Sequence, residues 1–115
     1  MYRQLVTKEL ASLFNALSHP DRVRIVEELR NRELNVNELE EILEISHSRV
    51  SQHLGVLKNH RLVITRREGR RVYYRLQTPL LAGWLLQGLD FVAAEIEHST
   101  KLESAVKQAR KVWGS

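Results

Sequence analysis

Polar and cationic side chains that can form directed hydrogen bonds are concentrated between residues 46 and 75. A first group combines hydroxyl, imidazole, amide and guanidinium side chains: Ser46, His47, Ser48, Arg49, Ser51, Gln52 and His53. A second group consists of arginines on both sides of a glycine: Arg66, Arg67, Arg70 and Arg71. Such groups bind base-pair edges and phosphate oxygens, so the pattern favours binding to double-stranded DNA over bond-making chemistry.

The charges of the chain are strongly segregated. Residues 46–75 contain eight Lys or Arg and one Glu, a net charge of +7, whereas residues 27–44 contain two Arg and seven Glu, a net charge of −5. The modest total of +4 conceals this polarity. Because cations that neutralise phosphates release counterions, the basic segment favours a nucleic acid as the partner.

Hydrophobic periodicity predicts the elements that position these groups. Apolar residues recur at helical spacing in five segments: 5–17, 23–29, 36–43, 50–57 and 80–96. His19 and Ser46 are predicted helix caps, and Pro20 suits the first turn of its helix. β-Favouring residues at 62–65 and 72–74 flank a turn at Glu68-Gly69, which predicts a hairpin. The segment from Lys101 onward is either helical or frayed.

These elements predict a mainly α fold with a small β-hairpin, in the order α-α-α-α-β-β-α. The length suits a single domain over residues 1–115, with a last helix and a tail. The apolar residues of the first and last helices exceed what one small domain can bury, so they predict a homodimer interface: Leu5, Leu10, Leu13, Leu81, Trp84, Leu85, Leu89 and Val92.

The composition argues against several classes of protein. The chain contains no cysteine, which excludes disulfides, thiolate metal sites and a cysteine nucleophile. It has no glycine-rich phosphate loop and no catalytic triad in a recognisable context, so we predict neither an enzyme nor a cofactor. Without an apolar run of about 20 residues or a signal-like N-terminus, a cytoplasmic protein is the simplest interpretation.

Three motifs resemble those of one known family. They are the run Ala16–Ile25 (ALSHPDRVRI), the Ser-x-Ser-x-Val-Ser-x-His-Leu pattern of 46–54, and the Gly-Arg-x-Val-Tyr-Tyr pattern of 69–74. Together they resemble the ArsR/SmtB winged-helix repressors, roughly over residues 5–98. The resemblance implies a winged helix-turn-helix fold with a hairpin wing. It also implies a homodimer that represses genes and usually releases DNA on sensing a metal or another stress signal.

The chain departs from that family at its metal-binding positions. Asn35-Val36-Asn37 stands where thiolate-site members have Cys-x-Cys, and asparagine supplies no thiolate. The positions of the second family site fall on Thr78, Leu80, Phe91 and Ala94, which are not zinc ligands. We therefore predict no metal site. Glu95 and His98 are interpreted as a solvated helix end, with an atypical metal site as the alternative.

Arg61 occupies a place where the family often has glycine, at the end of the helix that carries the polar residues. Either His60 or Arg61 is therefore expected to adopt the exit conformation at some energetic cost.

The resulting hypothesis is a homodimeric transcription regulator, most simply a repressor of an inverted-repeat operator. The polar helix face is expected to read bases, and the four wing arginines are expected to contact phosphates or the minor groove. His53 is included in the base-reading set, although packing is the simpler interpretation of its side chain. A winged-helix module for protein–protein contact and a non-specific architectural DNA-binding protein remain alternatives. The inducer, whether an organic ligand, an atypical metal, a partner protein or none, is open.

Overall fold

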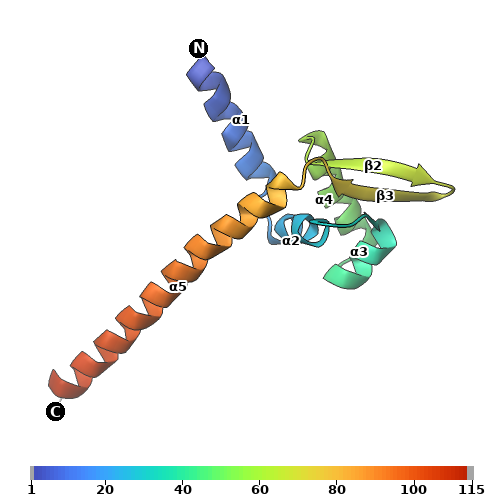
Figure 1. Cartoon of the computed structure of the whole chain (residues 1–115). Helices are drawn as coiled ribbons and strands as arrows, with labels where there is room; N and C mark the ends of the chain where they lie inside the picture. Colours follow the sequence, from blue (N-terminus) through green and yellow to red (C-terminus); the bar gives the residue numbers. More distant parts are fainter. Residues whose placement is uncertain (1, 114–115) are drawn as a thin grey trace. The chain divides into compact units, whose positions relative to one another are not determined.

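A computed structural model describes residues 2–113 (Figure 1). The elements are α1 (Tyr2–Ala16), α2 (Pro20–Glu28), β1 (Leu34–Asn35), α3 (Val36–Leu43), α4 (His47–Asn59), β2 (Val63–Glu68), β3 (Arg71–Leu76) and α5 (Leu80–Trp113). The chain divides into two compact units, residues 1–82 and 83–115, and each is described by itself. The predicted order of helices and hairpin is confirmed, while a single domain stays a prediction.

Short polar side chains start the helices of the first unit where the sequence predicts them. The Nδ1 atom of His19 accepts a hydrogen bond from the backbone N–H of Asp21 at 3.1 Å, and Pro20 lies in the first turn of α2. Ser46 caps α4 by accepting from the N–H of Arg49 at 3.3 Å. These bonds satisfy N–H groups that have no partner within the helix, and they fix where each helix begins.

The C-terminal end of α4 has a left-handed residue. Arg61 has φ of 59°, and its N–H donates to the carbonyl of Lys58. The N–H of Leu62 donates to the carbonyl of Leu57 at 2.9 Å. This pair of bonds defines a Schellman motif, whose left-handed position favours glycine because a Cβ is crowded there. The expected strained exit is confirmed and falls on Arg61 rather than His60.

The sheet is antiparallel with strand order β1-β3-β2. Glu68 pairs with Arg71, so the hairpin loop consists of Gly69 and Arg70, one residue later than the predicted turn. Gly69 has φ of 61°, which suits the first loop position of a type II′ hairpin. The short strand β1, which pairs Leu34 with Tyr74, was not predicted because two residues carry too little periodicity. We call the hairpin of β2 and β3 the wing (Figure 1).

The hydrophobic core of the first unit is built from α2, α3, α4 and β2. Its largest fully buried side chains are Ile25, Val26, Leu29, Leu39, Val50, Leu54, Leu57 and Val63. Because three of these come from α4, one face of that helix is fixed inward and the other must face outward. This packing sets the orientation of the polar residues that the sequence singles out.

The described part of the second unit, residues 83–113, belongs to α5. The tail predicted as either helical or frayed is helical from Lys101 to Trp113, and residues 114–115 lie outside the described part. In the part of the chain that the structure describes, no helix is long and apolar enough to cross a membrane.

Candidate nucleic-acid interface

The outward face of α4 carries a continuous set of short polar side chains. The exposed members of the predicted set are Ser46, His47, Ser48, Arg49, Ser51 and Gln52. The hydroxyls of Ser46 and Ser48 lie 3.3 Å apart, at the N-terminal end of the helix. On the opposite face, Val50 and Leu54 are at most 1% exposed. The helix therefore presents hydrogen-bonding groups on a rigid support, as base reading in a major groove requires.

His53 is a correction to the predicted DNA-binding set, because only 8% of it is exposed. Its ring lies against that of His19, with centroids 4.4 Å apart. Its Nε2 atom is 3.5 Å from an Asp21 carboxylate oxygen, and its Nδ1 atom is 3.4 Å from the Arg22 guanidinium. Burial lowers the pKa of His53, with His19 and Arg22 acting in the same direction. An imidazole that is buried in this way cannot reach a base edge.

Two exposed side chains of α4 are paired with acidic groups on neighbouring helices. The Arg49 guanidinium lies 3.0 Å from the carboxylate of Asp21 in the first turn of α2. The imidazole of His47 lies 3.5 Å from the carboxylate of Glu40 in α3. The sequence does not signal the contact between Asp21 and Arg49, because the two residues are 28 positions apart. No local spacing signals such a pair.

The four arginines that the sequence predicts to contact DNA from the wing divide into one with ion-pair partners and three without them among the described residues. The guanidinium of Arg66 binds both carboxylate oxygens of Glu33 at 2.9–3.1 Å, contacts Glu68 at 3.0 Å and lies over the ring of Tyr73. Hydrogen bonds from Arg66 lower the pKa of Glu33, and the same bonds raise the pKa of Arg66. Arg66 therefore ties the wing to the segment before β1, and any phosphate must compete with two carboxylates for it.

The remaining predicted wing residues are positioned differently. Arg67, Arg70 and Arg71 are exposed, and within residues 2–113 none of the ion pairs involves them. Arg70 belongs to the two-residue loop at the tip of the wing, beside Gly69. Their charges are consequently available to an anionic partner, and a protruding ribbon of cations next to a polar helix matches the geometry of winged DNA-binding domains.

One group of potential metal ligands occurs among the described residues, and it differs from those considered in the sequence. His19, Asp21 and His53 each offer a donor atom, and these atoms lie within 4.8 Å of one another. The guanidinium of Arg22 contacts His53 and that of Arg49 contacts Asp21, and their positive charges oppose a divalent cation there.

At one of the family's metal-binding positions, Asn35 has a structural role. Its side-chain oxygen accepts from the N–H of Glu38 at 2.9 Å, and the Glu38 carboxylate accepts from the N–H of Asn35. This reciprocal pair is a capping box that starts α3.

The residues predicted for a dimer interface lie on helices with exposed apolar side chains. In α1, Leu5 is 59% exposed and Leu10 is 47% exposed, while Leu13 is partly buried. In α5, Trp84, Leu89 and Val92 are exposed, and Leu81 and Leu85 are partly buried.

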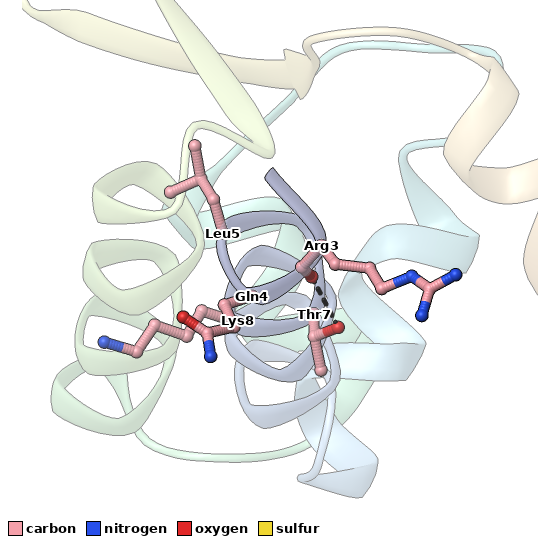
Figure 2. A pocket seen from close by; sticks show the side chains of 5 residues that line it. All are labelled: Arg3, Gln4, Leu5, Thr7 and Lys8. Carbon is pink, nitrogen blue, oxygen red and sulfur yellow. Dashed lines mark hydrogen bonds between the residues drawn. The ribbon is translucent and has the colours of Figure 1, made fainter. Parts of the chain in front are cut away.

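Figure 2 shows an open hollow beside α1, lined by Arg3, Gln4, Leu5, Thr7 and Lys8. All of these residues come from one helix, so the hollow is part of its uncovered surface rather than an enclosed ligand cavity.

The comparisons with known proteins agree with this geometry. The family model described as "Bacterial regulatory protein, arsR family" matches residues 19–65. The "HTH-type transcriptional regulator NmtR" of Mycobacterium tuberculosis is 41% identical over 90 residues, covering 78% of this chain and 72% of that protein. The chain belongs to the arsR family of bacterial regulatory proteins. This agrees with the resemblance found in its sequence motifs.

Two further similar proteins extend the comparison. The "Transcriptional repressor SmtB homolog" of Synechocystis is 42% identical over 69 residues, 60% of this chain. This chain spans only 52% of that relative's length. The structure of the transcriptional repressor BigR from Xylella fastidiosa matches with a TM-score of 0.65 and 38% identity, covering 80% of this chain and 96% of that one.

One further similar structure is described as a homodimer. A homodimeric winged helix-turn-helix DNA-binding domain from Mycobacterium bovis matches with a TM-score of 0.67 and 28% identity. It covers 81% of this chain and 85% of that one. The winged helix-turn-helix fold predicted from the sequence is thereby confirmed.

Proposed function

We propose that this protein is a homodimeric transcriptional repressor that binds an inverted-repeat operator in double-stranded DNA. The observation that carries the proposal is the exposed polar face of α4, held rigidly by the buried face behind it. The names of two relatives as transcriptional repressors support the same function. A repressor of this kind acts in the cytoplasm, where a bacterial chromosome lies.

In this proposal, α4 enters the major groove and the wing lies along the flanking backbone. Ser48, Ser51 and Gln52 can each donate and accept hydrogen bonds, which suits the donor and acceptor pattern of base edges. Arg67, Arg70 and Arg71 provide positive charges for phosphates or a narrow minor groove. Specificity then resides in α4, and most of the sequence-independent affinity resides in the wing.

The proposed dimer uses the apolar faces of α1 and α5. Exposed leucines on both helices are a hydrophobic surface that a second copy can cover, and the M. bovis neighbour is described as homodimeric. A two-fold symmetric protein binds a two-fold symmetric site, so half-sites about one helical turn apart, ~34–36 Å, are expected.

Footprinting and light scattering test this function together. DNase I footprinting of the purified protein on the DNA upstream of its gene should protect an imperfect inverted repeat, and light scattering at micromolar concentration should give the dimer mass. Equal affinity for random DNA indicates the architectural alternative. Absence of DNA binding at low salt indicates the protein–protein interaction alternative. A monomer, or protection of one isolated half-site, contradicts the dimeric model.

A further inference from the structure

We propose that Asp21 is a specificity-determining positioning residue: its carboxylate holds Arg49 of α4 and competes with DNA phosphate for that guanidinium. This inference rests on the proposed function, since it concerns how α4 engages DNA. It assigns a role to a residue of α2, outside the helix-turn-helix that α3 and α4 form.

One carboxylate, that of Asp21, lies against the N-terminal end of α4, which is the proposed recognition helix. Oδ2 of Asp21 lies 3.0 Å from Nη2 of Arg49. Only 19% of the Asp21 side chain is exposed, whereas 54% of the Arg49 side chain is exposed. Asp21 is therefore fixed at the first turn of α2, and Arg49 is the partner with room to move toward a ligand.

The described residues around Asp21 hold it in place, but apart from Arg49 they place no guanidinium against its carboxylate. His19 accepts the backbone N–H of Asp21, and Oδ2 of Asp21 faces Nε2 of His53 at 3.5 Å. The guanidinium of Arg22 is engaged elsewhere, because it donates to the carbonyls of Ala16 and Asn15 and faces Nδ1 of His53.

The neighbours of His53 define its protonation. An Arg22 N–H faces Nδ1, so the neutral imidazole carries its proton on Nε2, toward Asp21. Burial lowers the pKa of His53, which favours the neutral form of the ring. Among the groups around Asp21, Arg49 therefore remains the mobile cation that balances its charge.

Because Arg49 already has a carboxylate partner, it gains little by binding a phosphate of non-specific DNA instead. When Arg49 moves to a phosphate of random DNA, it exchanges one anion for another and leaves the Asp21 carboxylate without its cation. A guanine of the operator that lies within reach of the held guanidinium does not require this exchange, because only Nη2 of Arg49 donates to Asp21 and the other N–H groups can still donate to the base. Asp21 thus lowers affinity for random sequence more than for the operator, and so raises the ratio between the two.

Fluorescence anisotropy with an operator duplex and a random duplex, each over a range of salt concentrations, tests the inference. Wild type must first bind the operator more tightly than random DNA; if it does not, the proposed function fails. Given that preference, Asp21→Asn should tighten random-DNA binding about fivefold and lower the specificity ratio by a similar factor. Because one more cation becomes available to phosphate, the slope of log affinity against log salt should steepen by about 0.9.

A double-mutant cycle separates this role from simple removal of a negative charge. In an Arg49→Gln background, Asp21→Asn should no longer change random-DNA binding, because the competed cation is gone. Glu44→Gln is the matched control, since Glu44 is an exposed acid at the end of α3 with no ion pair to α4. An equal gain from Asp21→Asn with and without Arg49 would overturn the proposal.

Arg49→Gln alone keeps the test decisive if Asp21→Asn does not fold. It alters an exposed side chain, and it should weaken operator binding while leaving random-DNA binding within about twofold. If Arg49→Gln makes the salt dependence of random-DNA binding shallower by as much as Arg70→Ala does, then Arg49 already contacts phosphate in the wild type and the proposed competition is wrong. The last measurement adds one equivalent of zinc. If zinc binds and changes operator affinity tenfold, and if His53→Gln abolishes this change, then the cluster of His19, Asp21 and His53 is a metal site instead.

Discussion

The recognition helix and the wing are both basic and exposed, yet they hold their charges in different ways. In α4, Arg49 is paired with Asp21, Lys58 is an exposed cation near the C-terminal end, and the other exposed side chains are polar. In the wing, Arg66 is paired with Glu33, while Arg67, Arg70 and Arg71 have no ion-pair partner within the described residues. The exposed face of α4 consists mostly of hydrogen-bonding groups, whereas the tip of the wing consists mostly of arginines without ion-pair partners in the described part of the chain.

This contrast assigns different contributions to the two regions. Oriented hydrogen-bonding groups on a rigid support discriminate between sequences but contribute little to binding at a distance. Unpaired cations attract any phosphate backbone and make binding sensitive to salt. We therefore expect mutations in α4 to act on selectivity and mutations in the wing tip to act on affinity.

The largest effect is expected where the buried face of α4 is truncated. Leu54→Ala removes a side chain that is 1% exposed and should lower the free energy of unfolding by about 2–5 kcal/mol. Ser51→Ala, on the exposed face of the same helix, should change it by no more than about 0.5 kcal/mol. Urea unfolding followed by circular dichroism measures both. Similar costs for the two variants would show that α4 is not anchored as described.

A smaller effect, confined to selectivity, is expected from Gln52→Ala. Loss of a bidentate contact from this exposed amide to a base should reduce discrimination between the operator and a mutated operator by about 1–3 kcal/mol. Affinity for random DNA should change little, because the amide carries no charge. Competition binding with a panel of single-base operator variants measures the loss, which should concentrate at one position in each half-site.

The corresponding wing variant should behave in the opposite way. Arg70→Ala removes an unpaired cation at the tip, so it should weaken binding to all sequences by about 1 kcal/mol. The salt slope should become shallower by about 0.9, since one counterion fewer is released. Anisotropy titrations on operator and random DNA give both quantities. If Arg70→Ala lost selectivity as Gln52→Ala does, the division between the two regions would be wrong.

The sequence predicted local features well and distant pairings poorly. The caps at His19 and Ser46 and the outward face of α4 follow from residues within one or two helical turns. By contrast, the pairing of Arg66 with Glu33 joins positions 33 apart, and counting charges cannot show which cation already has a partner. His53 was listed with the DNA-binding residues although packing was the simpler interpretation, and it is buried because it lies at the boundary of the apolar stripe, where α2 packs against α4.

The smallest effect is expected at Arg61, the residue that joins the recognition helix to the wing. Its φ of 59° is left-handed, and the Schellman bonds on either side fix it there. Glycine adopts this conformation without a Cβ penalty, although it gains more entropy in the unfolded chain. Arg61→Gly should therefore raise the free energy of unfolding by about 0.5–1 kcal/mol, as measured by thermal or urea unfolding.

The matched variant for this site is Arg61→Ala, which removes the same charge but retains a Cβ. It should be no more stable than wild type, so the difference between the alanine and glycine variants isolates the backbone term. Both should lose the same small amount of DNA affinity, since both remove one exposed cation. If the glycine variant instead loses much more affinity than the alanine variant, then the strained junction sets the angle between α4 and the wing. In that case the two regions do not act independently.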